Sequence, residues 1–210
     1  MTPQLDHETA QKSSHWPIVV DLDGTLTPAN TLLVSLLLAL KKNPLILFLL
    51  PFWVLPGRAS FKCKIAAHAV FSAEKLVYCS PLLDYLRREQ CGGRKVILAT
   101  AAHVSIANAV AAHLGLFSDV LATEAGRNLK GGKKLEAIRC LVGPEFVYAG
   151  DSKADLPIWK AAKAAILVGV KRSVVNSLGA DVTVECVFAH ESVTTTNWLK
   201  MLLTLCGRSH

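Results

Sequence analysis

The stretch that decides the fold is IVVDLDGT, at residues 18–25. Its first three residues are apolar and β-branched, which is typical of a short buried strand. Two carboxylates, Asp21 and Asp23, follow at once, and Gly24 permits a tight turn directly after them. The stretch therefore predicts a buried strand that ends in a polar turn with two acidic side chains.

The rest of the chain alternates between short apolar runs and helical patterns. The apolar runs predict further strands at residues 96–99, 119–121, 146–149 and 165–168. Helical periodicity predicts helices between them at residues 104–114, 133–141 and 154–162. This alternation favours an α/β fold with a doubly wound, parallel sheet, and ligands of such sheets bind at the carboxyl ends of the strands.

Polar side chains follow several of these predicted strands. Asp21 and Asp23 end the first strand, and Thr100 follows the second. Asp151 follows the strand at 146–149, and Asp155 lies at the start of the next helix. Four carboxylates that converge without Cys or His ligands suit a hard cation, and Mg²⁺ suits them best where phosphate is also bound.

A lysine and a hydroxyl would complete a site for phosphoryl transfer. Lys130 offers a compact positive charge, and Lys133 and Lys134 are nearby alternatives. A solvated side chain is the simpler interpretation of Lys130. Thr100 and Asp155 also have a simpler interpretation, because each can cap the helix that follows it.

Four segments resemble the motifs of the haloacid dehalogenase (HAD) superfamily. In chain order they are DLDGTLT at residues 21–27, Thr100 after the strand at 96–99, Lys130 within NLKG, and GDSKAD at residues 150–155. Their order and contexts match the superfamily over residues 17–170. The resemblance implies a three-layer, Rossmann-like HAD core with a parallel sheet and an inserted small helical cap.

The resemblance also implies catalytic roles. Asp21 would attack phosphorus and form an aspartyl-phosphate. Asp23 would protonate the leaving oxygen and then activate water, and this second carboxylate favours a phosphatase over a dehalogenase. Thr100, Ala101 and Lys130 would bind the phosphoryl group of the substrate.

The metal site implied by the resemblance uses the same strand ends. Asp151 would bind Mg²⁺ together with Asp21 and the backbone carbonyl of Asp23. Asp155 would support that site.

The composition is apolar and basic. The 210 residues are 51% hydrophobic and 19% charged, with a net charge of +7, which excludes a disordered chain. Six scattered cysteines form no CxxC pair and indicate neither a zinc site nor a disulfide framework. No basic run is interleaved with aromatic residues, so no nucleic-acid partner is expected. The first 16 residues lack an apolar signal region, which favours a cytoplasmic protein.

Residues 30–90 carry much of this excess, and the superfamily inserts its helical cap at this place. The range holds eight Lys and Arg residues against three acidic residues. Residues 32–40 and 45–55 are apolar on nearly every helical face. Because Lys41 and Lys42 separate the two ranges, no transmembrane span is predicted. Apolar helices with basic flanks favour contact with an anionic membrane surface, here the inner membrane face. The alternative is a cap whose apolar faces bury one another.

A narrower resemblance concerns residues 43–59 and 150–159. They are similar to the HAD domain that precedes UbiA-type prenyltransferases in bacterial fusions. This resemblance predicts a prenyltransferase partner, reached through the cap and a C-terminal helix, and a lipid-linked (polyprenyl) phosphate substrate. The expected organisation is a tail at 1–15, a core at 16–29 and 91–190, the cap at 30–90 and the C-terminal helix at 191–210.

Together these observations predict a Mg²⁺-dependent phosphatase. Its substrate would be a phosphomonoester, either a phosphorylated small molecule or a lipid-linked phosphate. Two alternatives stay open, namely a soluble enzyme of the phosphoserine-phosphatase type and a non-catalytic or regulatory module of a membrane prenyltransferase. The intact set of acidic, hydroxyl and lysine residues argues against a pure docking module.

Overall fold

The computed structural model describes residues 16–124 and 127–190. The tail and the C-terminal helix predicted at 1–15 and 191–210 lie outside the described residues. The strands are β1 (Ile18–Val20), β2 (Val96–His103), β3 (Asp119–Thr123), β4 (Val147–Gly150), β5 (Ala164–Val168) and β6 (Val184–Phe188). The α-helices are α2 (Thr31–Lys42), α3 (Ile46–Val54), α4 (Arg58–His68), α5 (Ser80–Cys91), α6 (Val104–Leu114), α7 (Gly132–Val142), α8 (Leu156–Trp159) and α9 (Arg172–Leu178). Two 3-10 turns are η1 (Ala73–Lys75) and η2 (Lys153–Asp155).

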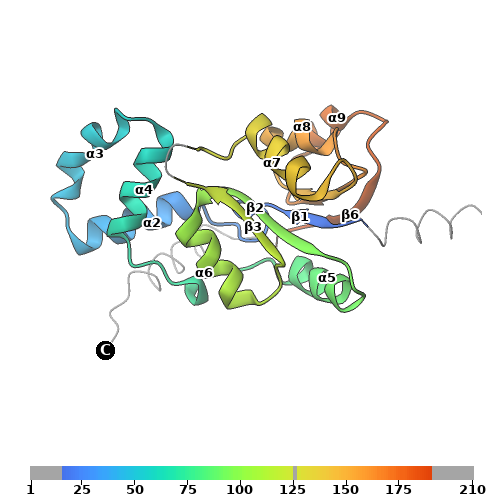
Figure 1. Ribbon diagram of the computed structural model, residues 1–210, viewed down its shortest axis with the longest axis horizontal. Helices are drawn as coiled ribbons and strands as arrows, with labels where there is room; N and C mark the ends of the chain where they lie inside the picture. Colours follow the sequence, from blue (N-terminus) through green and yellow to red (C-terminus); the bar gives the residue numbers. More distant parts are fainter. Residues whose placement is uncertain (1–15, 125–126, 191–210) are drawn as a thin grey trace, which may run out of the picture.

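The six strands form one parallel sheet in the order β3-β2-β1-β4-β5-β6. Helices α5 and α6 lie on one side of it, and α7, α8 and α9 lie on the other (Figure 1). The chain runs from β1 outward through β2 and β3 and then returns to β4 on the opposite side of β1. The predicted α/β fold with a Rossmann-like parallel sheet is confirmed, and its switch point lies between β1 and β4.

The central strand β1 is buried on both faces, because successive side chains of a strand point to opposite sides. Ile18 and Val20 pack into the core that α5 and α6 cover, while Val19 packs into the core under α7, α8 and α9. All three residues have no exposed surface. This double burial explains why an uninterrupted apolar run, rather than an alternating one, marks the strand.

Several elements differ from the sequence-based expectation. Strand β2 runs to His103, so Thr100 lies inside the strand and not after it. The helix predicted at 154–162 is reduced to the turn η2 and the four-residue helix α8. Two observed elements were not predicted from the sequence. One is β6, an edge strand whose side chains are all at least partly exposed, and the other is the short helix α9.

Helices α2, α3 and α4 form a separate small body beside the sheet (Figure 1). Their shared core consists of Ala39, Ile46, Trp53 and Ile65. Helix α5 instead packs into the main core through Leu82, Leu83, Tyr85 and Leu86. Within the predicted cap range 30–90, α2 to α4 thus share a small core of their own, whereas α5 packs with the sheet. Within the described part of the chain, no helix combines the length and the apolar character needed to cross a membrane.

Candidate active site

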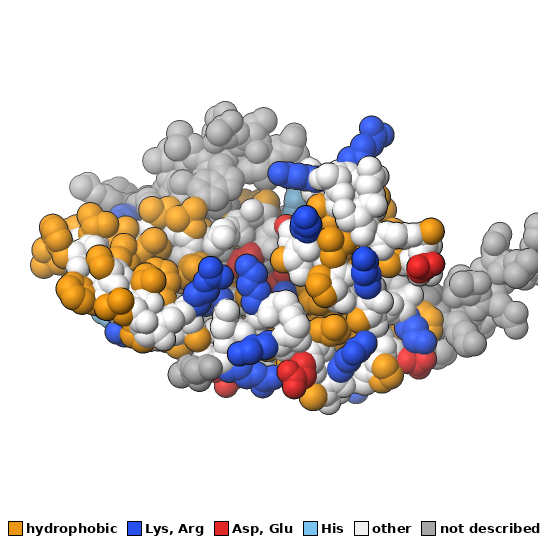
Figure 2. All heavy atoms as spheres, turned by 90° about the horizontal axis from the view of Figure 1, so that it is seen from above, with side chains coloured by type: hydrophobic (Ala, Val, Ile, Leu, Met, Phe, Trp, Pro, Cys, Tyr) orange, Lys and Arg blue, Asp and Glu red, His pale blue; other side chains and the backbone are white. Residues whose placement is uncertain are grey.

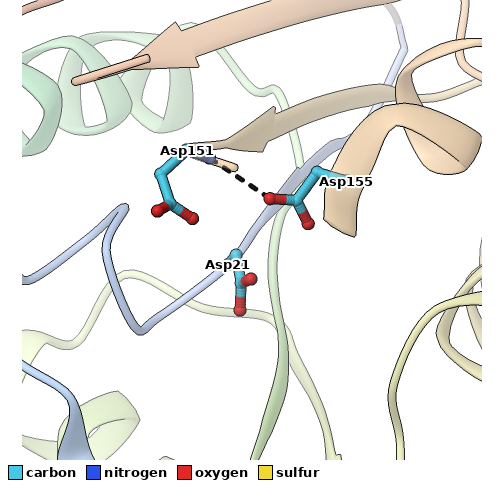
Figure 3. Close-up of side chains that lie close together, drawn as sticks. All are labelled: Asp21, Asp151 and Asp155. Atoms are coloured by element: carbon cyan, nitrogen blue, oxygen red, sulfur yellow. Dashed lines mark hydrogen bonds between the residues drawn. The ribbon is translucent and has the colours of Figure 1, made fainter. Parts of the chain in front are cut away.

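Three carboxylates meet at the switch point of the sheet. Asp21 directly follows β1, Asp151 directly follows β4, and Asp155 ends η2. The backbone N–H of Asp21 donates to the carbonyl of Ala149 at 3.0 Å, which ties the ends of the two strands together. One carboxylate oxygen from each of the three residues lies within 4.8 Å of the other two (Figure 3). The structure thus brings together three of the four acidic residues that the sequence predicted at one site.

Gly24 makes the approach of Asp151 possible. Its φ of +81° lies in the left-handed region, and a Cβ at this position would overlap the carboxylate of Asp151. The turn is closed by a hydrogen bond from the Gly24 N–H to the carbonyl of Thr27 at 2.7 Å. On its other side, the Nε2 of His190 donates to the Gly24 carbonyl. The glycine is therefore required by the site as well as by the turn.

The electrostatics of the cluster favour a bound cation. Burial raises the pKa of Asp21 to about 6, although the positive charge of Lys134 lowers it. Burial, followed by the nearby charges of Asp155 and Asp21, raises the pKa of Asp151 to about 7. Carboxylates held this close repel one another unless a cation or a shared proton relieves them. The oxygen-only donor set fits a hard divalent cation.

Asp155 is the most constrained of the three carboxylates, with 3% of its surface exposed. Its Oδ2 accepts hydrogen bonds from the backbone N–H groups of Asp151 and Ser152, and its Oδ1 accepts one from the Tyr148 hydroxyl at 2.9 Å. It forms a capping box with Ser152 but no side-chain cap on α8. The alternative in which Asp155 merely caps the following helix is therefore wrong, and its side chain orients the backbone of Asp151.

Asp23 is not one of these three clustered carboxylates, but it lines the same cavity. Its Oδ1 accepts a hydrogen bond from the N–H of Thr31 at 2.8 Å, at the first residue of α2. Burial raises the pKa of the Asp23 carboxyl, while the hydrogen bond from Thr31 lowers it. A raised pKa favours the protonated form of a carboxyl, which can donate its proton to a leaving group.

The lysine that pairs with Asp21 is Lys134 rather than Lys130. The Nζ of Lys134 lies 2.9 Å from Oδ2 of Asp21, and its side chain is 5% exposed. It also donates to the hydroxyl of Tyr148 at 3.1 Å. Lys130 lines the same cavity, but its side chain is exposed, and Lys133 is exposed on α7.

Helical phase explains this difference. Lys134 shares the inward face of α7 with Ala137 and Ile138, three and four residues further on, and all three are buried. Lys133 is turned by about 100° from that face and is solvated. A lysine in phase with apolar positions of a helix was the signal in the sequence that could have identified Lys134.

The end of β2 forms part of the wall of the cavity. Thr100 is 1% exposed, and its Oγ1 accepts a hydrogen bond from the N–H of Ala102 at 3.0 Å. Ala101 and Ala102 line the cavity. Thr100 does not cap a helix, since His103 is the N-cap residue of α6. Thr100 therefore helps to fix the end of β2 next to the cavity.

A cation from the cap reaches the same wall. Lys62 of α4 donates from Nζ to the carbonyl of Ala101 at 2.6 Å and to Oδ1 of Asn128 at 2.8 Å. Thr123 donates its hydroxyl to the same Ala101 carbonyl at 2.8 Å. Burial lowers the pKa of Lys62, whereas the charge of Asp23 raises it. Sequence analysis missed Lys62 and Asn128, because their contact joins elements that are 66 residues apart.

These groups line one cavity of about 560 Å³ between the cap and the core. The four carboxylates and Lys134 belong to its lining. Three further cationic side chains line it, namely Arg58, Lys62 and Lys130. The cap adds the apolar side chains of Leu32, Val54 and Phe61. The cavity therefore combines an acidic metal-type cluster, several cations and an apolar wall.

The family assignment follows from a direct match. The family described as haloacid dehalogenase-like hydrolase matches residues 18–160, which include every acidic residue of the cluster. The chain belongs to this family of hydrolases, as the sequence motifs predicted. A curated relative, the uncharacterized protein y4nM of Sinorhizobium fredii (strain NBRC 101917 / NGR234), is 39% identical over 154 residues. The match covers 73% of this chain and 30% of that relative, so this chain spans under a third of the relative's length.

Solved structures share the fold. A substrate-bound phosphoserine phosphatase complex superimposes with a TM-score of 0.53 at 16% identity, over 81% of this chain and 93% of the other. A protein of unknown function from Bordetella pertussis Tohama I gives a TM-score of 0.59 at 16% identity, over 81% and 97% of the two chains. At such identities the likeness concerns the fold alone.

Proposed function

We propose that this protein is a Mg²⁺-dependent phosphomonoester hydrolase that works through an aspartyl-phosphate intermediate. The observation that carries the proposal is the position of Asp21. It ends β1 at the switch point, pairs with a buried lysine, and lies beside two further carboxylates. Membership of the haloacid dehalogenase-like hydrolases supports a hydrolytic reaction, and ligands of parallel sheets bind at the carboxyl ends of the strands, where Asp21 lies.

The chemistry divides between Asp21 and Asp23. A carboxylate oxygen of Asp21 forms a new bond to phosphorus while the ester P–O bond breaks, and the leaving oxygen takes a proton from Asp23. Asp23 then takes a proton from water as the water oxygen attacks the aspartyl-phosphate, which releases inorganic phosphate and restores Asp21. The ion pair with Lys134 supports this assignment, because it favours the ionised, nucleophilic form of Asp21.

The acidic trio fits Mg²⁺ by its donor chemistry. Asp21, Asp151 and Asp155 offer only carboxylate oxygens, the ligands that Mg²⁺ prefers, and the raised pKa values of Asp21 and Asp151 reflect charge that a cation would compensate. When bound, the ion would neutralise negative charge on the phosphoryl group. Asp155 would hold Asp151 in place through the backbone hydrogen bond at 3.3 Å.

Phosphoryl oxygens would be held by groups of the chain itself. Lys134 supplies the positive charge next to Asp21, and Ala101 and Ala102 line the same cavity. Thr100 supports this part of the lining through its hydrogen bond to Ala102. Lys130 then serves as an exposed cation at the rim of the cavity rather than as the phosphate-binding lysine.

For the substrate we propose a lipid-linked phosphate. The cap lines the cavity with three apolar side chains, Leu32 of α2, Val54 of α3 and Phe61 of α4. An apolar wall next to a phosphate site suits a substrate with an apolar tail. A soluble, phosphoserine-like substrate is the alternative, and the shared fold with phosphoserine phosphatase favours testing it. A prenyltransferase partner remains a prediction from sequence resemblance.

Hydrolysis of p-nitrophenyl phosphate tests the reaction. We expect turnover that requires Mg²⁺ and that falls at least about 1,000-fold in the Asp21→Asn variant, because the nucleophile is lost. A panel with a polyprenyl-phosphate sugar and phosphoserine then tests the substrate class. Absence of turnover on every phosphate of a broad panel would overturn the enzymatic proposal. Preference for phosphoserine would overturn only the lipid-linked substrate.

A further inference from the structure

The outer end of the cap carries a large exposed apolar surface. We call it the apolar cap tip, and it consists of Leu45, Leu47, Phe48, Leu49, Phe52, Val54 and Leu55. These side chains are between 44% and 80% exposed. They belong to α3 and its flanking residues, and hydrophobic side chains gather over this end of the molecule in Figure 2. Contiguous exposed apolar surfaces of this kind mark interaction sites.

The cap does not need this surface for its own stability. Ile46 and Trp53 are the buried residues of α3, and they pack with Ala39 and Ile65 of the neighbouring helices. Leu50 packs partly against the same core, and the remaining side chains of α3 are exposed and nevertheless all apolar. A helix that is apolar on its outward side as well as its inward side is typical of contact with lipid or with a buried interface.

Charge identifies which of these two partners fits. Residues 31–73 contain no Asp or Glu, while Lys41 and Lys42 precede the apolar cap tip and Arg58 follows it. Lys41 and Lys42 are exposed at the end of α2, and Arg58 begins α4. A basic rim without acidic residues around an apolar centre is complementary to an anionic bilayer, whose surface potential attracts Lys and Arg.

We propose that the apolar cap tip docks on the surface of an anionic phospholipid bilayer. Helix α3 has nine residues and is about 14 Å long, less than half the thickness of the hydrocarbon core, so it would lie in the interface. Phe48 and Phe52, one helical turn apart, enter the acyl boundary, and the basic rim contacts the headgroups.

The docking also orients the candidate active site. Val54 of the apolar cap tip and Arg58 of the rim both line the cavity that Asp21 also lines. Docking would therefore bring the mouth of the cavity to the bilayer surface, where a lipid-linked phosphate could enter without leaving the membrane. This last step rests on the proposed function, whereas the docking itself rests on the surface alone.

Vesicle co-sedimentation with the full chain tests the docking. The probes are vesicles of phosphatidylcholine alone and vesicles with added phosphatidylglycerol, at low salt. We expect binding to the anionic vesicles that falls about 30-fold or more in Phe48→Ser/Phe52→Ser. Lys41→Gln/Lys42→Gln should weaken it roughly 30-fold, and added salt should weaken it further.

Matched controls separate docking from folding and from catalysis. Leu141→Ser/Val175→Ser removes exposed apolar side chains that lie outside the cap, and Lys171→Gln/Arg172→Gln removes exposed positive charges outside the cap. Both double variants should therefore bind vesicles like the wild type. Asp21→Asn should also bind normally, which keeps a failure of the proposed reaction distinct from a failure of docking. Melting temperature and p-nitrophenyl phosphate hydrolysis of the Phe48/Phe52 variant should match the wild type.

Three results would overturn the proposal. The first is the absence of binding of the wild type to anionic vesicles at low salt. The second is binding that the Phe48/Phe52 variant retains in full. The third is self-association of the wild type in solution without vesicle binding, together with a monomeric Phe48/Phe52 variant. This result would show that a second copy of the chain covers the apolar cap tip.

Discussion

Replacing Lys134 by Met tests the identity of the catalytic lysine. Lys134 and Asp21 are 5% and 13% exposed and their charged atoms are 2.9 Å apart. At an effective dielectric constant of about 20, such a pair attracts by about 6 kcal/mol, although desolvation offsets part of this. Without Lys134, the pKa of Asp21 should rise above its value of about 6, so that the nucleophile is protonated at pH 7.

We therefore expect Lys134→Met to lower kcat/KM on p-nitrophenyl phosphate at least about 100-fold at pH 7. Because a raised acid pKa leaves the carboxylate ionised only at higher pH, residual activity should increase from pH 7 to pH 9. Lys130→Met, at the rim of the same cavity, is the matched control and should stay within about threefold of the wild type. Thermal unfolding of both variants checks that the fold is retained.

The reverse result would refute this reasoning. If Lys130→Met is inactive while Lys134→Met keeps full activity, the lysine predicted from the sequence motif is the catalytic one. The pairing of Lys134 with Asp21 would then be structural. An unchanged pH profile in Lys134→Met would likewise contradict the effect on the pKa of Asp21.

Three further outcomes are expected. Mg²⁺ at about 100 times its Kd should stabilise the protein by about 2.7 kcal/mol and raise Tm by roughly 5–10 °C at pH 8, as measured by thermal unfolding. Asp151→Asn should abolish this increase in Tm. The increase should also shrink towards pH 5, because protons then occupy the carboxyls of Asp21 and Asp151, whose pKa values are raised to about 6 and about 7. Gly24→Ala should remove that Mg²⁺-induced shift and most activity, because its Cβ overlaps Asp151, whereas Gly179→Ala, at an equally positive φ in open space, should keep both. Lys62→Met should speed hydrogen exchange of α4 more than about tenfold by breaking two cap-to-core hydrogen bonds, and an unchanged exchange rate would show that these bonds do not hold the cap.

Much of the fold could be predicted because the main strands are buried on both faces. A strand such as β1 or β4 must be apolar at every position, and such runs stand out from the polar turns that follow them. Strand β6 escaped prediction because its side chains are partly exposed and its pattern is mixed. The sequence pattern also could not show that α5 packs into the main core while α4 packs into the small helical core, because this difference depends on tertiary packing.

The acidic residues of the site could be predicted for a related reason. Asp21, Asp151 and Asp155 follow strands that end at the same edge, so their convergence depends on sheet order alone. The lysine was harder to predict, since several lysines lie within five residues of one another and only the phase of α7 selects Lys134. The contact of Lys62 with Ala101 and Asn128 depends on how the cap sits over the core.

The amino-acid sequence by itself determined the family, the strand-ending carboxylates and the apolar, basic character of the cap. These features depend on residue type and on order along the chain, which local physics can interpret. Only the tertiary structure decided which lysine pairs with Asp21, that Thr100 helps to fix the end of β2, and which face of α3 remains exposed. Those outcomes depend on side-chain direction and on contacts between residues far apart in the chain, because burial and pairing are properties of the packed molecule.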